Sequence, residues 1–109
     1  MQKYIYNVTV NVDNSVHEEW LVWIKQHILK VLSTGKFDGA TFTKVLVEEE
    51  MGGHTYSIQY KAYSRKALDK YYEENAEELR SEGLKKFADK TLAFRTELEV
   101  IDEYAVNFK

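Results

Sequence analysis

The spacing between apolar residues changes several times along this chain, from every second residue to every third or fourth. This alternation of spacing is the feature that most constrains the fold. Residues 4–12 alternate between apolar and other side chains, which is typical of a strand with one buried face. Residues 15–34 instead place apolar side chains three and four positions apart, as in an amphipathic helix. The remaining segments show the alternating pattern at 37–50, 54–63 and 92–103 and the helical pattern from residue 64. The predicted order is strand, helix, strand, strand, helix, strand.

Capping residues and glycines mark the ends of the two predicted helices. Ser15, with a glutamate three residues later, matches a capping box and predicts the start of the first helix. Gly35 closes that helix, because glycine readily adopts the left-handed conformation that is usual there. Ser64 is predicted to cap the second helix, and Gly83 to interrupt it before a shorter helical turn.

The order of elements predicts an α+β fold of the split βαβ, or ferredoxin-like, type. Such a βαββαβ chain forms a four-stranded antiparallel sheet with both helices on one face. The 109 residues are enough for one hydrophobic core, and no linker, repeat or low-complexity segment divides them. We therefore expect a single domain over residues 1–109.

One face of this sheet is left uncovered by the helices. The alternation assigns a mixed set of side chains to that open face: Asn7, Thr9, Asn11, Val45, Val47, Ser57, Gln59, Lys61, Arg95 and Glu97. Two copies pairing sheet to sheet would bury this surface and match its charges across a two-fold axis. The sequence thus predicts a homodimer.

Composition argues against several classes of partner. The net charge of −3 provides no basic surface, so neither nucleic acid nor an anionic membrane is an expected partner. No apolar run approaches the roughly 18 residues that a membrane helix needs, and the first residues lack the pattern of a signal peptide. Cysteine is absent, which removes disulfides and thiolate chemistry. We expect a cytoplasmic protein.

Histidine and glutamate are the first candidates for metal chemistry, and their spacing argues against it. His17 and His27 are ten residues apart on one helix, so they do not share the i, i+3 or i, i+4 spacing of a metal pair. The consecutive Glu48, Glu49 and Glu50 lack the surrounding pattern of a calcium loop and indicate a charged strand end instead. No glycine-rich phosphate loop precedes a predicted helix, which argues against a nucleotide cofactor. We therefore expect no metal and no cofactor.

The polar candidates for a ligand pocket lie on the outer strands. Arg95 and Glu97 are two residues apart and must share a face, where they could form a pocket with Asn7 inside a dimer. Alternatively, the two form a structural pair that fixes the register of the dimer. His54 opens a strand beside a glycine turn, and Trp23 lies off the main apolar stripe of its helix, so each is a candidate for the pocket lining.

Several strings of the sequence resemble one bacterial family in combination. These strings are YIYNVTVNV at 4–12, HEEW at 17–20, TGKF at 34–37, KVLVEEE at 44–50 and LAFRTEL at 92–98. Together they resemble domain of unknown function 4286, a family found mainly in Bacteroidetes-like bacteria. The resemblance covers nearly the whole chain and implies a ferredoxin-like fold of the dimeric α/β-barrel group. It implies no catalytic residue that can be placed on this sequence.

Three functions stay open at this point. The first is a small bacterial homodimer without catalysis. The second is a small-molecule binder, or a cofactor-independent enzyme similar to the monooxygenase-like members of the dimeric α/β-barrel group, with a pocket between sheet and helices. The third is a protein-interaction module that uses Trp23 and the strand edges.

Overall fold

The computed structural model describes residues 3–47 and 52–106 and has the predicted βαββαβ order. Its strands are β1 (Tyr4–Val12), β2 (Phe37–Lys44), β3 (His54–Ala62) and β4 (Thr91–Glu99). All paired strands are antiparallel, in the order β2-β3-β1-β4. The prediction of a ferredoxin-like α+β fold is confirmed.

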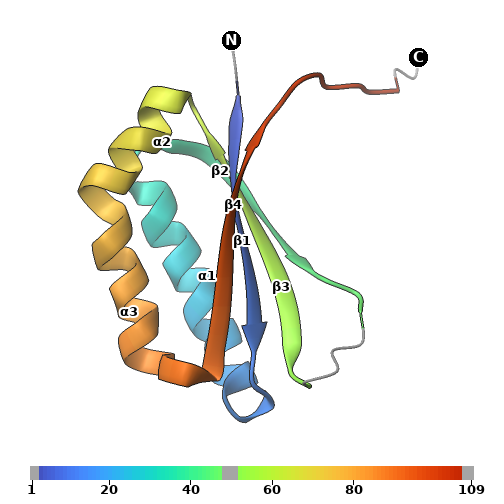
Figure 1. Ribbon diagram of the computed structural model, residues 1–109, viewed down its shortest axis with the longest axis vertical. Coiled ribbons are helices and arrows are strands. Elements are labelled where there is room, and N and C mark those ends of the chain that lie inside the picture. Colours follow the sequence, from blue (N-terminus) through green and yellow to red (C-terminus); the bar gives the residue numbers. More distant parts are fainter. Residues whose placement is uncertain (1–2, 48–51, 107–109) are drawn as a thin grey trace.

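The helices form one layer against the sheet. Helix α1 (His17–Ser33) follows β1 after a 3-10 turn, η1 (Asn14–Val16). The second helical segment runs through α2 (Arg65–Tyr71), a π-helical turn η2 (Tyr72–Ala76) and α3 (Glu77–Phe87), and the 3-10 turn η3 (Ala88–Lys90) leads to β4. Figure 1 shows α1 and the α2–α3 segment on the same side of the sheet. No helix in residues 3–47 and 52–106 is long and apolar enough to cross a membrane.

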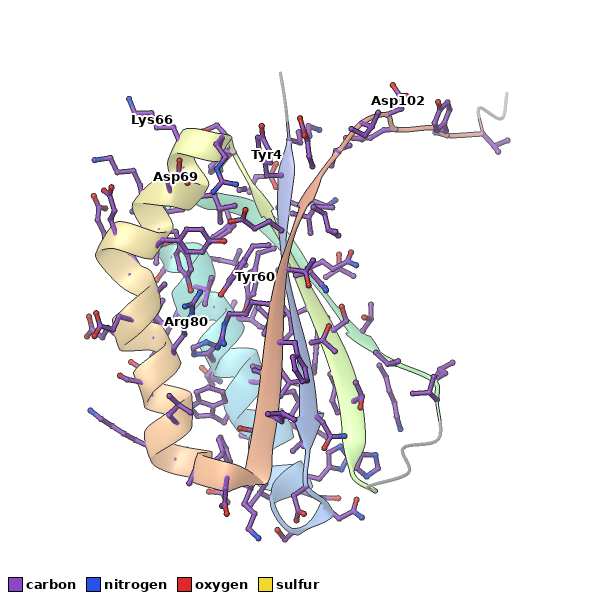
Figure 2. The ribbon with its side chains drawn as sticks, in the orientation of Figure 1. Tyr4, Tyr60, Lys66, Asp69, Arg80 and Asp102 are labelled. Atoms are coloured by element: carbon purple, nitrogen blue, oxygen red, sulfur yellow. The ribbon has the colours of Figure 1, made fainter. Side chains whose placement is uncertain are left out.

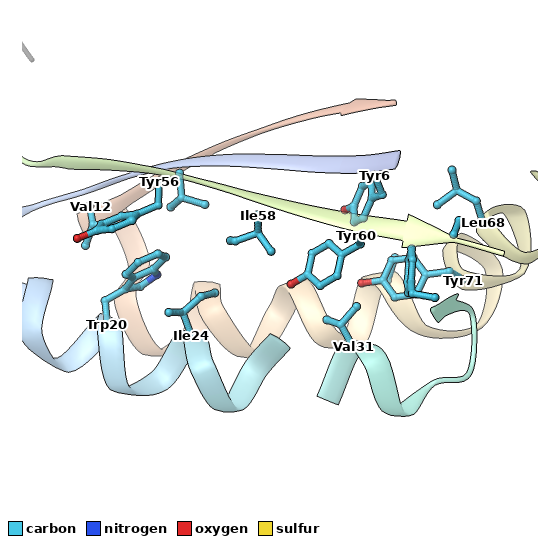
Figure 3. Close-up of a cluster of buried hydrophobic side chains, with 14 of the residues drawn as sticks. Tyr6, Val12, Trp20, Ile24, Val31, Tyr56, Ile58, Tyr60, Leu68 and Tyr71 are labelled. Atoms are coloured by element: carbon cyan, nitrogen blue, oxygen red, sulfur yellow. The ribbon is translucent and has the colours of Figure 1, made fainter. Parts of the chain in front are cut away.

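The core lies between these two layers and is rich in aromatic rings. Tyr6 is its centre: its ring lies 5.6 to 6.3 Å, centroid to centroid, from those of Phe37, Tyr60, Tyr71 and Tyr72. Figure 3 shows Trp20, Ile24 and Val31 of α1 facing the sheet. The buried side chains are Tyr6, Val10, Val12, Trp20, Ile24, Val31, Phe37, Tyr56, Ile58, Tyr60, Ala62, Leu68, Tyr71, Ala76 and Phe87.

The helix ends agree with the predictions at two places and differ at two. Gly35 has a φ of 80° at the end of α1, and the Ser64 hydroxyl accepts a hydrogen bond from the Ala67 backbone at 3.0 Å, as predicted. The predicted capping box is wrong, because Asp13 rather than Ser15 accepts the backbone N–H bond at this turn, at 2.8 Å. Gly83 does not interrupt the helix: α3 continues through it, and the missing side chain leaves room for the indole of Trp23.

The strands are shorter than the alternation predicted. Strand β2 ends at Lys44 and β4 ends at Glu99, several residues before the predicted limits of 50 and 103. The Val45 backbone N–H still donates to the carbonyl of Thr55, at 2.9 Å, so one more link follows β2. The predicted charged strand end at Glu48–Glu50 lies outside the described residues.

The register of β4 overturns one predicted face assignment. Arg95 is opposite Val8 and Glu97 is opposite Tyr6, and residues directly opposite in a sheet share a face. Both side chains therefore lie on the helix side, not on the open face with Asn7, which is opposite Thr96. The assumption that the apolar side of β4 faces the helices was wrong; Leu92, Phe94 and Leu98 are on the open face instead.

Candidate functional site

A cavity of about 320 Å³ lies between the sheet and the helices α1 and α3. Its walls are mostly apolar and aromatic, and polar side chains reach it from both the sheet and the helices. The lining includes Tyr6, Val8, Val10, Trp20, Trp23, Ile24, His27, Val31, Ile58, Tyr60, Tyr71, Leu79, Arg80, Gly83, Phe87, Ala93 and Arg95. A concave, mainly apolar space with a few convergent polar groups is the usual form of a small-molecule site.

Arg80 of α3 is the most enclosed charged group of this cavity. Figure 2 shows its side chain extending from the helix toward the sheet. One terminal nitrogen, Nη2, donates to the hydroxyl of Tyr6 at 2.9 Å, and the guanidinium carbon lies 5.9 Å from the ring centre of Tyr72 and 6.0 Å from that of Tyr6. Its Nε is buried and has no hydrogen-bond partner among the described residues. The ring contacts thus hold the side chain while leaving a donor unused.

His27 of α1 carries the second buried nitrogen of the cavity lining. Its imidazole stacks on the indole of Trp23 with 4.5 Å between ring centres, and Nδ1 is buried without a partner in the described part of the chain. Burial lowers the pKa of His27 below its ordinary 6.5; the charge of Glu82 opposes this shift, whereas Lys30 and Arg95 favour it. The imidazole is therefore neutral at pH 7, with one nitrogen able to donate and the other able to accept.

The tyrosines of the cavity are neutral donors and acceptors. Burial raises the pKa values of both Tyr60 and Tyr71 well above their ordinary value of 10. The charges of Arg80 and Arg95 oppose this rise in the pKa of Tyr71. Figure 3 shows the Tyr60 and Tyr71 side chains together between the sheet and the helices. The net charge that faces the cavity is therefore positive, since its lining contains no carboxylate.

Two of the predicted pocket residues reach the cavity. Arg95 does so from β4, on the helix side of the sheet, and Trp23 does so from α1. Trp23 is packed edge-on against Phe87, with 5.3 Å between ring centres, and its indole would be 3.0 Å from a side chain placed at Gly83. The position of Trp23 off the main apolar stripe thus reflects a contact with α3 rather than with solvent.

The other three predicted pocket residues lie elsewhere. Asn7 is on the open face, where its Oδ1 accepts from the hydroxyl of Ser57 at 2.7 Å. His54 stacks on His17 at 3.7 Å between ring centres, at the far end of β3. Glu97 is on the helix side but binds Arg65, at 2.8 and 3.2 Å, and the hydroxyl of Tyr72, at 2.5 Å. The predicted grouping of Asn7 with Arg95 and Glu97 is therefore wrong.

His27 and Arg80 were not among the predicted pocket residues, although the sequence contains a pattern for each. On α1 the residues Trp20, Ile24, His27 and Val31 follow steps of four, three and four, and all but His27 are buried and apolar. On the second helical segment Ala76, Arg80, Gly83 and Phe87 follow the same steps. A polar residue in the middle of such a stripe must face the core. That signal identifies both residues without the structure.

Metal ligands do not gather in the described residues. No three His, Asp or Glu side chains of residues 3–47 and 52–106 are arranged to hold an ion. The pair of His17 and His54 is stacked ring on ring, and a nitrogen of His17 lies 2.6 Å from the hydroxyl of Tyr56. The polar groups that line the cavity are arginine, imidazole and phenol side chains, which can bind and polarise a ligand.

The fold and the helix–sheet cavity define a ferredoxin-like α+β protein, and solved structures share this architecture. A dimeric ferredoxin-like protein from an uncultured marine organism aligns with a TM-score of 0.70 at 12% identity, over 95% of this chain and 100% of its own. A conserved protein of unknown function from Bacteroides thetaiotaomicron aligns with a TM-score of 0.66 at 13% identity, over 91% of this chain and 98% of its own. A dimeric ferredoxin-like protein of unknown function from Thermobifida fusca aligns with a TM-score of 0.52 at 10% identity, over 88% of this chain and 92% of its own.

Residues 3–101 match the family model described as domain of unknown function (DUF4286), and the chain belongs to this family. The predicted resemblance is thereby confirmed. No curated protein matches the chain. At identities of 10 to 13% the structural neighbours show the fold alone. The monooxygenase-like alternative stays a prediction.

Proposed function

We propose that this protein is a homodimeric binding domain that holds a small organic molecule in the cavity between its sheet and its helices. The observation that carries this proposal is the pair of buried nitrogens, Arg80 Nε and His27 Nδ1, that have no partner in the described chain and belong to side chains lining the cavity. Leaving a buried polar group unpaired costs about 1 to 3 kcal/mol. A bound molecule with matching groups removes that cost.

The cavity has dimensions that suit a compact ligand. Ligand pockets usually measure roughly 300 to 1,000 Å³, so the 320 Å³ found between α1, α3 and the sheet is at the small end. Aromatic rings on both sides, from Trp23 to Tyr60, favour a flat molecule of one or two rings. Such a void in an otherwise packed core lowers stability unless it is filled.

A second copy of the chain is the proposed occupant of the open sheet face. This face carries Phe94 and Leu92, whose exposed fractions are 61% and 58%, beside polar side chains of β1 and β3. Large apolar groups on an uncovered sheet mark an interaction surface. A two-fold axis through the face would pair β4 of each copy with the sheet of the other. The marine and Thermobifida neighbours are both described as dimeric, which supports this arrangement.

The neutral probe 2-naphthamide tests the proposed cavity by ligand-detected NMR titration. We expect saturable binding to the wild-type protein and its loss in the variant Ala93→Leu, because a larger side chain at this lining position of β4 fills the void. The same variant should unfold at a higher temperature, since it buries apolar atoms without enlarging the core.

The matched control is Ala105→Leu, the same change in the exposed segment after β4. It should bind the probe as the wild type does. The proposal fails if the wild type does not bind the probe, or if Ala93→Leu binds it unchanged while remaining folded by circular dichroism.

A further inference from the structure

We infer that the natural ligand is an organic carboxylate, whose charged group is held by Arg80 with help from Arg95 while its apolar body lies among the aromatic side chains. This inference rests on the proposed function, because it assigns a chemical class to the molecule in that cavity. Three independent features of the lining support it: unpaired positive charge, unused hydrogen-bond donors and apolar walls.

The positive charges of the cavity have no counter-charge within the described chain. Arg65 shows the contrasting case, since its guanidinium pairs with Asp69 at 2.7 Å and with Glu97 at 2.8 Å. Neither Arg80 nor Arg95 takes part in any ion pair of the described residues. Enclosed arginines are normally paired. The half-buried Arg80, with an enclosed Nε and no carboxylate partner in the described chain, therefore favours an anion supplied by a ligand.

The hydrogen-bond donors that remain fit a carboxylate. Nη2 of Arg80 is engaged by the hydroxyl of Tyr6, whereas Nε has no partner. The planar fork of arginine matches the two oxygens of a carboxylate, and such charge-assisted bonds are about twice as strong as neutral ones. The neutral His27 supplies one further donor or acceptor through Nδ1. Glu82, whose charge acts on His27, is itself paired with Lys30 at 3.3 Å.

The walls restrict what the rest of the ligand can be. Trp23, Ile24, Tyr60 and Phe87 present ring faces and aliphatic groups, and the phenols that accompany them are uncharged. A molecule with several charges would leave some of them facing these apolar surfaces, at high desolvation cost. A single carboxylate on a flat apolar body satisfies both parts of the lining.

The test compares 2-naphthoate with its neutral isostere 2-naphthamide, again by NMR titration at pH 7. We expect the carboxylate to bind wild-type protein at least about tenfold more tightly, as one charge-assisted bond predicts. Arg80→Met should abolish this preference while leaving binding of the amide, because methionine retains the apolar stem. Arg80→Lys should keep part of the preference for the carboxylate. The control Arg65→Met, at a paired arginine outside the cavity lining, should keep all of that preference.

The outcomes separate the inference from the proposed function. Equal affinity of the wild type for the two probes would overturn the carboxylate assignment and leave the cavity as a binding site for neutral molecules. A preference that persists unchanged in folded Arg80→Met would also overturn it. Failure of both probes to bind would refute the binding function itself, and the inference with it.

Discussion

At the scale of single residues, Glu97 shows how one carboxylate ties the edge strand to the second helical segment. It accepts two bonds from Arg65, at the start of α2, and one from the hydroxyl of Tyr72 in the π-helical turn. The hydrogen bonds from Arg65 and then from Tyr72 hold the pKa of Glu97 below its ordinary value of 4.5, and burial opposes this shift. The charged form of Glu97 therefore contributes to stability.

The substitution Glu97→Gln should lower the free energy of unfolding at pH 7 by up to about 1 kcal/mol, because the ion pair is largely exposed and screened. The pKa of this carboxylate is lower in the folded state than in the unfolded chain. Its contribution to stability is therefore complete at pH values above the unfolded-state pKa and is lost as the pH falls through the folded-state pKa. Urea denaturation between pH 7 and pH 3 should therefore show the difference from wild type shrinking below about pH 4.5.

Glu99→Gln is the matched control for this series. Glu99 lies two residues further along β4 on the same face, and it makes no ion pair in the described residues. A pH-dependent loss of equal size in both variants would show that net charge, rather than the contact with Arg65, is responsible.

At the scale of elements, the second helical segment positions Arg80 through its start and its irregular middle. Ser64 begins the segment, and the π-helical turn Tyr72–Ala76 lies one turn before Arg80. Such π-turns are rare and frequently lie beside functional sites. The turn places Tyr72 where its ring contacts both Tyr6 and the guanidinium of Arg80.

Removing the cap should destabilise this segment. Ser64→Ala eliminates the hydroxyl that accepts the backbone N–H of Ala67, so we expect a loss of about 1 kcal/mol in the free energy of unfolding, measured by urea denaturation. Ser81→Ala, within α3, serves as the control and should be neutral or slightly stabilising, because alanine is the better helix former there. Equal losses in both variants would contradict a capping role for Ser64.

At the scale of the whole molecule, the two faces of the sheet differ in the side chains they carry and in what covers them. The helix side holds the core and the cavity, and the open side carries the exposed apolar residues of β4. On β4 the apolar residues lie on the open side, which the proposed second copy would cover, and Arg95 and Glu97 lie on the helix side.

A charge on the open face should disrupt the proposed dimer. We expect twice the chain mass at micromolar concentration by sedimentation equilibrium for the wild type, and the single mass for Phe94→Glu, since each copy would then bury a carboxylate. Val22→Glu, at a residue of α1 that is 69% exposed, should remain dimeric. A wild type that is monomeric at this concentration would refute the homodimer.

The sequence by itself determined the order and kind of the elements, because the period of the apolar residues and the caps at Gly35 and Ser64 are local signals. The resemblance also identified the family correctly. Tertiary structure alone decided which side of β4 meets the helices, because that choice depends on the register of its pairing with β1. It also decided that Gly83 accommodates Trp23, and that His27 and Arg80, 53 positions apart by their numbers, reach one cavity. Convergence of distant residues follows from packing of the layers, which no local pattern specifies.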